Sequence, residues 1–277
     1  MKGATQLLPL NRRGRWRQEI LAGWGLVERN FSLLRRYLSW EVVDLFYNVV
    51  NALTIAFIGV GQGPQVVLYL VIGALLWGFL SVLFNEVAQS VQWERWEGTI
   101  EYTFMAPIHR LTYLLGASWW AVLYGLLRTT VVLLALVSFL DLQLEAANLL
   151  SALLVLCVSS FSFIGLGLIA AVLPLMSPEK GSQAAHIVQG FILLISGVYY
   201  DVSVLPRWLQ PLSALSPATY TLRAERAALL QGAGLAELLP DLLRLAGFAF
   251  FFIPVGYLIF RAGEMYALRT GKLKRNG

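Results

Sequence analysis

Long uninterrupted apolar stretches dominate the sequence. Six of them approach or exceed the roughly 20 residues that an α-helix needs to cross the hydrocarbon core of a bilayer. They cover residues 42–60, 66–84, 111–140, 149–176, 184–200 and 242–260. The third and fourth are longer than a bilayer requires, so we expect these helices to tilt or to project beyond the lipid. Because a transmembrane β-barrel would show segments of about ten residues with alternating polarity, the pattern predicts an all-α membrane protein with six transmembrane helices at residues 42–260.

The segment before the first span has helical periodicity with one apolar face. The apolar residues recur every three or four positions, and Arg29, Arg35 and Arg36 lie off that row. The row consists of Ile20, Trp24, Val27, Phe31, Leu34 and Leu38. Because a helix of this kind lies in the plane of the lipid headgroups, we predict a cytoplasmic arm and an interfacial helix at residues 1–41.

Positive charge lies almost entirely on one side of the predicted membrane. The two terminal segments and the two loops on their side contain 16 Lys and Arg residues, and the opposite side contains four. Cytoplasmic segments carry the excess of Lys and Arg, so we predict cytoplasmic termini and a basic tail at residues 261–277. Arg128 lies inside the third span and needs a partner or a route to the headgroups. Residues 7–10 are too few for the apolar core of a signal peptide, so we expect the N-terminal segment to be retained.

Two segments outside the spans carry turn and capping signals. In the cytoplasmic loop, Gly98 suits the left-handed end of one helix and Thr99 suits the N-cap of the next, which Pro107 stops. This loop is either a solvated turn or a docking helix for a cytosolic partner. On the outer side, Ser216 and Pro217 predict the start of a helix that ends at Gly232. A shorter helix is predicted at residues 205–211, and the pair would form re-entrant helices at residues 201–232.

Composition excludes several classes of protein. Of the 277 residues, 58% are apolar and 13% are charged, against roughly 45–50% and 25% in soluble proteins. Disordered chains, rods and ordinary soluble enzymes are excluded. Cys157 is the one cysteine, so no internal disulfide or thiolate zinc site is expected, and His109 and His186 lie too far apart in the chain to predict a metal site. The net charge of +5 fits anionic headgroups, and we expect no binding to nucleic acid.

The order of these parts resembles the permease subunits of type-2 ATP-binding-cassette (ABC) exporters. The specific segments are E-G-T-I-E at residues 97–101 and L-S-P-A-T-Y at residues 215–220, and the likeness covers nearly the whole chain. The resemblance implies two permease and two ATPase subunits, a coupling helix at about residues 94–107 and an outer gate. We assign to coupling Glu94, Glu97, Gly98, Thr99, Glu101 and Pro107. We assign to the outer gate Tyr199, Tyr200, Pro206, Trp208, Ser216, Pro217 and Tyr220.

Polar side chains at membrane depth form three groups, on spans that the resemblance places at the interface between permeases. Asp44, Asn48 and Asn51 share one helix face. Such groups line a wet pathway or form interhelical hydrogen bonds worth about 0.6 kcal/mol each. Both interpretations stay open for Asn48 and Asn51, and the pathway is favoured for Asp44. The pathway candidates are Asp44, Asn48, Asn51, Asn85, Glu86, His186 and Gln189.

The energy source is expected in another protein. The sequence has no G-x-x-x-x-G-K-[ST] motif and no stretch between spans long enough for a nucleotide-binding domain. We therefore predict a permease subunit without its own ATPase or bound cofactor, in the bacterial cytoplasmic membrane, exporting an amphiphile such as a drug, lipid or lipid-linked glycan. The expected partners are two cytosolic ATPase subunits that bind ATP and Mg²⁺, a second permease copy in a homodimer or heterodimer, and the lipid bilayer. A secondary transporter and an intramembrane lipid-modifying enzyme are the alternatives.

Overall fold

A computed structural model describes residues 12–140, 147–177 and 180–271, and the structural statements below concern those residues. This part of the chain consists of helices joined by short turns. The helices are α1 (Arg12–Arg36), α2 (Leu38–Val60), α3 (Pro64–Glu97), α4 (Ile100–Met105), α5 (Arg110–Phe139), α6 (Leu149–Ala170), α7 (Val172–Met176), α8 (Gly181–Ile195), the 3₁₀ helix η1 (Val202–Val204), α9 (Gln210–Ser213), α10 (Pro217–Gln231) and α11 (Leu235–Arg269).

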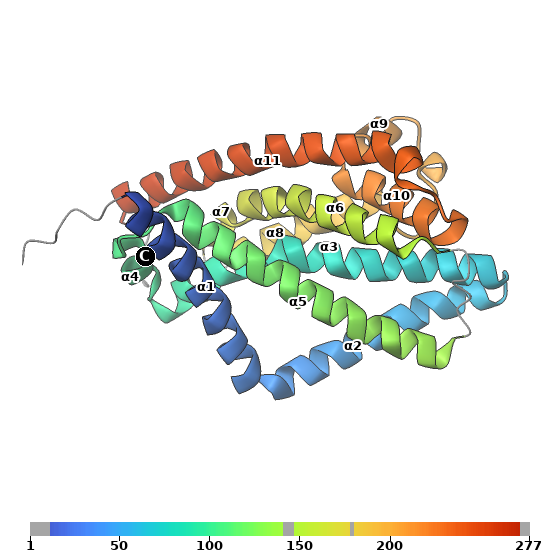
Figure 1. The fold of residues 1–277 in the computed structure, drawn as a ribbon, viewed down its shortest axis with the longest axis horizontal. Helices are drawn as coiled ribbons and strands as arrows, with labels where there is room; N and C mark the ends of the chain where they lie inside the picture. The colour runs from blue at the N-terminus through green and yellow to red at the C-terminus, as the bar shows by residue number, and fades with distance from the viewer. Residues whose placement is uncertain (1–11, 141–146, 178–179, 272–277) are drawn as a thin grey trace, which may run out of the picture.

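The helices form an elongated bundle (Figure 1). α3 and α6 lie against each other at its centre, with α11 packed on α6 and α5 packed on α3. α1 crosses α5 and meets α2 at a sharp corner. α4 lies at one end of the bundle and α10 at the other (Figure 1), and we call these the α4 end and the α10 end.

Five predicted spans coincide with helices that are long and apolar enough to cross a membrane. They are α2, α3, α5, the stretch of α6 and α7, and α11. These helices confirm an all-α membrane protein. The fifth predicted span, residues 184–200, corresponds to α8, whose 15 residues extend about 22 Å at 1.5 Å per residue. This length is below the roughly 30 Å of a hydrocarbon core, so a sixth crossing remains a prediction.

The two terminal segments are helical over most of their described length. In α1, Val27 of the predicted apolar row is buried, whereas Ile20 and Trp24 are exposed. An apolar row open on one side suits an interfacial helix, although the position of α1 in the headgroup plane remains a prediction. α11 continues past residue 260 to Arg269 without a break, so the first part of the predicted basic tail extends this helix. Residues 1–11 and 272–277 of the predicted terminal segments lie outside the described residues.

α6 and α11 approach each other closely through glycines. A Cβ atom on Gly256 would lie 2.8 Å from the carbonyl oxygen of Gly165 and 2.8 Å from Cβ of Leu168. Small residues permit such close contact between helix backbones in membranes. The close packing of α6 against α11 therefore depends on the absence of side chains at these positions.

We expect Gly256→Leu to lower the free energy of unfolding by about 1–3 kcal/mol, the usual cost of overpacking. Thermal unfolding of the detergent-solubilised protein, followed by tryptophan fluorescence, measures the effect. Gly247→Leu is the matched control, because Gly247 is on the same helix and a Cβ atom there would meet no atom within 4 Å. Equal unfolding temperatures for the two variants would contradict the close-packing argument.

Candidate functional site

The loop between α3 and α5 contains the predicted short helix. α3 ends at Glu97, and Gly98 follows in the left-handed conformation with φ of 73°. α4 begins two residues later, with Glu101 in its first turn. Ala106 is extended, as the residue before a proline prefers, so the helix ends ahead of Pro107. The predicted left-handed helix end at Gly98 is confirmed, and residues 94–97 belong to α3 rather than to the short helix.

Two details of the predicted loop are wrong. Thr99 has a helical backbone, with φ of −90° and ψ of −11°, and makes no side-chain cap, because an N-cap hydroxyl needs an extended backbone to reach the helix N–H groups. Glu94, which the resemblance assigns to contact with the ATPase, does not lie on the surface. It is buried and accepts a 2.5 Å hydrogen bond from Arg29 of α1, because the long Arg29 side chain reaches α3 from α1, which itself packs on α5.

α4 is attached firmly to the bundle on one side. Ile100 is fully buried, and Phe104 packs against the same hydrophobic cluster. The Arg110 guanidinium donates to the Phe104 carbonyl oxygen at 2.6 Å, lies 4.4 Å from the centre of its ring, and donates to Oε1 of Glu264 in α11 at 2.7 Å. Arg110 thus joins α4, α5 and α11. Sequence reasoning missed this contact, because Glu264 is 154 positions away.

The other side of α4 is open. Tyr102 and Met105 are 73% and 76% exposed, and the neighbouring carboxylates of Glu97 and Glu101 are exposed as well. Trp96, at the end of α3, is half exposed. This surface, formed by Trp96, Glu97, Glu101, Tyr102 and Met105, is called the α4 face below.

The polar residues of α2 face α5. Asp44 forms an ion pair with Arg128. Asp44 is thus the partner that Arg128 requires inside a span. Nδ2 of Asn48 donates to the Asp44 carbonyl oxygen at 2.6 Å. Asn48 and Asn51 line one small cavity of about 90 Å³ together with Trp77, Arg128 and Tyr199. These polar residues of α2 therefore make contacts within the bundle and also line a cavity.

The predicted polar residues of α3 point in two directions. Nδ2 of Asn85 donates to Oε1 of Gln189 in α8 at 2.8 Å, which joins two of the three predicted groups. Glu86 points the other way and accepts a 3.1 Å hydrogen bond from Nε1 of Trp120 in α5. His186 is exposed on α8 and does not line the cavity of Asn48 and Asn51.

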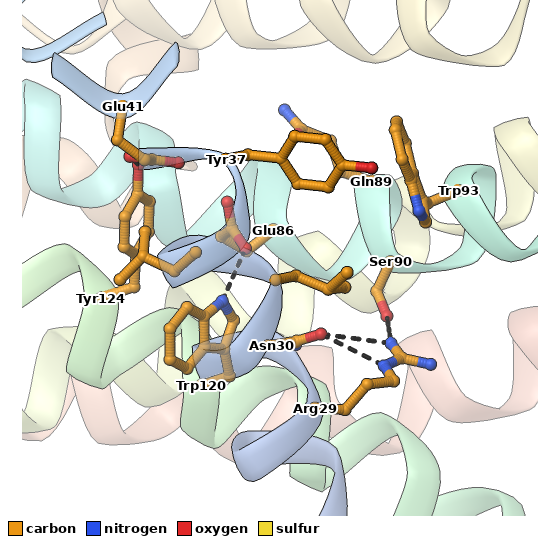
Figure 2. Close-up of a pocket in the computed structure, with 12 residues that line it drawn as sticks. Arg29, Asn30, Tyr37, Glu41, Glu86, Gln89, Ser90, Trp93, Trp120 and Tyr124 are labelled. Carbon is orange, nitrogen blue, oxygen red and sulfur yellow. Dashed lines mark hydrogen bonds between the residues drawn. The ribbon is translucent and has the colours of Figure 1, made fainter. Parts of the chain in front are cut away.

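Glu86 lines a cavity of about 230 Å³ between α1, α2, α3 and α5 (Figure 2). Glu41 of α2 also lines it, and Oε2 of Glu41 accepts a 2.7 Å hydrogen bond from the Tyr124 hydroxyl. We call it the α1–α5 cavity. Sequence reasoning identified Glu86 but missed Glu41, which stands one position before the predicted span. The spacing could have revealed it, because Glu41 precedes Asp44 by three positions and Asn48 by seven on the same helix face.

The predicted outer segment lies at the α10 end. The helix predicted at residues 205–211 is wrong in position, because the chain forms η1 at Val202–Val204, a turn, and then α9 at Gln210–Ser213. Pro211 is in the first turn of α9, where a missing N–H is tolerated. The proline therefore starts a helix here and does not end one.

The second outer helix agrees with its prediction except for the cap. α10 runs from Pro217 to Gln231 and ends at Gly232 in the left-handed conformation. Ser216 occupies the N-cap position, but its side chain makes no capping hydrogen bond. Its hydroxyl instead shares a 2.7 Å hydrogen bond with that of Ser196, because the end of α8 packs beside it. Ser216 thus connects α8 to α10.

Tyr199 and Tyr200 line different cavities. Tyr199 lines the cavity of Asn48 and Asn51, whereas Tyr200 lines a cavity of about 520 Å³ at the α10 end. The Tyr200 hydroxyl donates to the Leu194 carbonyl oxygen. These adjacent tyrosines therefore line two different cavities.

The remaining predicted gate residues do not gather at one point. Pro206 and Trp208 are exposed, the latter by 73%. The Tyr220 hydroxyl donates to the Ala214 carbonyl oxygen at 3.0 Å. Pro206 and Trp208 thus lie on the surface, while Tyr220 ties α10 to the turn before it.

Charged residues tie α10 to its neighbours. Arg226 donates to the carbonyl oxygens of Gly197 and Val198 at 3.0 and 2.5 Å, and its guanidinium lies 3.5 Å from the centre of the Tyr69 ring. Arg223 forms an ion pair with Asp241 of α11. The turn after α8 is therefore held between α3 and α10.

Two carboxyl groups of the outer segment have shifted pKa values. Hydrogen bonds from the side chain and the backbone of Ser203 lower the pKa of Asp201. Burial raises the pKa of Glu225 well above its usual value, and its Oε1 atom has no hydrogen-bond partner among the described residues. Apart from Glu225, the charged residues of this segment are Asp201, Arg207, Arg223 and Arg226.

Apolar helices of spanning length, with short helices at both ends, define a multi-pass all-α membrane protein. The sequence model of the family described as ABC-2 type transporter matches residues 23–230. This range is more than half of the chain, so the chain belongs to the ABC-2 type transporter family. The protein is therefore a transmembrane permease subunit of an ABC transporter. No curated protein matches the chain.

Proposed function

We propose that this permease subunit is half of the membrane part of an ATP-driven exporter, which moves an amphiphilic substrate out of the cytoplasm or the inner leaflet. In this proposal it lies in a bacterial cytoplasmic membrane with both termini in the cytoplasm, which places the α4 end inside the cell. The excess of Lys and Arg on that side supports this orientation. The substrate is a drug, a lipid or a lipid-linked glycan.

The α4 face is the observation that carries the proposal. It combines exposed aromatic and apolar side chains with two carboxylates, directly after the longest central helix. Ile100 and Arg110 fix its other side to α3, α5 and α11. A force applied to α4 would therefore pass to spanning helices without being absorbed by a loose loop, which is what coupling to an ATPase requires. Glu97, Gly98, Thr99, Glu101 and Pro107 serve this contact, and Glu94 supports it through Arg29.

The partners follow from the same arrangement. Each permease would bind one ATPase subunit at its α4 face, and a second permease copy would complete the pathway, giving two of each. ATP and Mg²⁺ would bind in the ATPase subunits. α2 carries many exposed apolar side chains, among them Phe46, Tyr47 and Phe57, and supports contact with lipid or with the second copy.

Co-expression of the tagged permease with the ABC ATPase encoded nearest to its gene tests the proposal. We expect a complex of two permeases and two ATPases by size-exclusion chromatography with light scattering, and ATP-dependent uptake of substrate into inside-out vesicles. Transport driven by an ion gradient without ATP would instead establish a secondary transporter. Failure of every co-expressed ABC ATPase to bind would also contradict the proposal.

The outer gate is part of the same proposal, with Tyr199 and Tyr200 as its seal. Ser216 is 3% exposed, so in a Cys157→Ser background we expect Ser216→Cys to react slowly with a membrane-impermeant thiol reagent. A nonhydrolysable ATP analogue should change its labelling rate several-fold in the assembled complex. Trp208→Cys is the control and should react quickly in both states. Unchanged labelling of Ser216→Cys would indicate that this segment does not gate the pathway.

A further inference from the structure

The α1–α5 cavity combines aromatic rings with carboxylates (Figure 2). Tyr37, Trp93, Trp120 and Tyr124 line it. Trp120 and Tyr124 are stacked, with ring centres 5.7 Å apart and an angle of 12° between their planes. Aromatic faces attract cations, and cages of such rings bind quaternary ammonium groups. The rings alone therefore favour a positively charged organic ligand.

The carboxylates of this cavity have uncharged hydrogen-bond partners. Glu41 accepts from the Tyr124 hydroxyl at 2.7 Å, and Glu86 accepts from the Trp120 indole at 3.1 Å. Arg29 is the only Lys or Arg among the residues that line it in the described part of the chain.

The nearby cations are already paired. Arg29 forms its ion pair with Glu94, and Arg128 forms one with Asp44. Neither Glu41 nor Glu86, which line the cavity, forms an ion pair with a cation of the described residues. An anionic ligand is therefore disfavoured there.

An apolar groove continues from this cavity. It measures about 280 Å³, and every lining residue except Glu28 is apolar or aromatic. It shares Leu34, Trp120 and Tyr124 with the α1–α5 cavity. The outer wall is open, since Trp24 is 52% and Leu127 is 55% exposed. An aromatic pocket with two carboxyl groups thus opens into an apolar groove at the surface of the bundle.

We propose that the two spaces together bind an amphiphile with an ammonium head group, its head in the α1–α5 cavity and its apolar chain in the groove. The proposal rests on the proposed export function, for which this would be the substrate entry site. Glu41 and Glu86 supply the counter-charge, and the rings of Tyr37, Trp93, Trp120 and Tyr124 supply cation–π contact. A metal ion fits less well, because no group of three or more His, Cys, Asp or Glu in the described residues is arranged to bind one.

Binding of radiolabelled dodecyltrimethylammonium to the full-length permease, immobilised in dodecyl maltoside, tests the inference without ATP or the ATPase. We expect saturable binding that dodecyl sulfate does not displace. The double variant Glu41→Gln with Glu86→Gln should weaken binding at least about tenfold, as should Tyr37→Leu. Tyr37→Phe keeps the ring and should bind normally. Glu237→Gln, an exposed site at the start of α11, is the control for loss of a carboxylate.

Competition distinguishes the two sources of an ammonium amphiphile. Displacement by lysophosphatidylcholine at lower concentration than by unlabelled probe would identify a lipid head group, and the reverse order would identify a cationic amphiphile without phosphate. Either result supports the inference. Equal displacement by dodecyl sulfate, or normal binding by both the double glutamate variant and Tyr37→Leu, would overturn it. A permease that assembles with its ATPase but does not bind the probe would refute this inference alone, whereas one that binds the probe but no ATPase would refute the export function.

Discussion

Replacing Glu97 and Glu101 together by lysine is expected to abolish substrate-stimulated ATP hydrolysis while leaving the permease folded in the membrane. Both carboxylates are exposed on the α4 face, so the fold loses little. The largest contribution that either carboxylate makes to the stability of the fold is the interaction of Glu101 with the α4 dipole, about 0.3–1 kcal/mol. At a protein interface, in contrast, reversed charges placed opposite like charges cost several kcal/mol. The double variant should therefore lose its contact with the ATPase while the permease stays folded.

The measurement is ATP hydrolysis by the reconstituted complex, with and without substrate, beside the amount of permease extracted in monodisperse form. Glu237→Lys reverses an exposed charge at the start of α11 and should leave the coupled activity unchanged. Glu94→Lys is a useful contrast, because its side chain is buried against Arg29, and this variant should reduce the yield of folded protein. Normal substrate-stimulated hydrolysis by the Glu97 and Glu101 double variant would remove the coupling role from the α4 face.

Asp44→Leu is expected to reduce transport at least about tenfold while changing the unfolding temperature little. Its side chain is half exposed, at 50%, and that of Arg128 is 19% exposed, so the ion pair is partly solvated and stabilises the fold only modestly. Arg128 also lines the cavity shared by Asn48 and Asn51. Loss of its partner would leave an unneutralised cation beside the proposed pathway, where it would alter the passage of substrate.

A charge swap separates the pathway role from a structural one. Asp44→Arg combined with Arg128→Asp should restore the ion pair and the stability but not the transport rate, because the pathway would meet the charges in exchanged positions. Substrate uptake into inside-out vesicles and thermal unfolding are measured on the same preparations. Full recovery of transport in the double variant would make the pair structural. So would an Asp44→Leu variant that assembles poorly but whose folded fraction transports at the normal rate.

The amino-acid sequence alone determined the features that depend on neighbouring residues. Apolar length predicts a spanning helix because a bilayer has a fixed thickness, and α2, α3, α5, α6 with α7 and α11 follow. Gly98 and Gly232 end their helices in the left-handed conformation, which glycine adopts without strain. Pro217 starts α10, because its missing N–H has no helical partner at that position. These constraints act within a few residues of the chain and hold in any packing arrangement.

The tertiary structure decided the partners of polar side chains. Arg128 and Asp44 were each recognisable as costly at membrane depth, but only the packing of α2 on α5 pairs them. Glu94 turns from a predicted surface charge into a buried partner of Arg29, and the Ser216 hydroxyl bonds to Ser196 instead of capping α10. Whether such groups meet depends on crossing angles and on the rotation of each helix about its axis. Those are set by the fit of all side chains in the bundle, which no local stretch of sequence encodes.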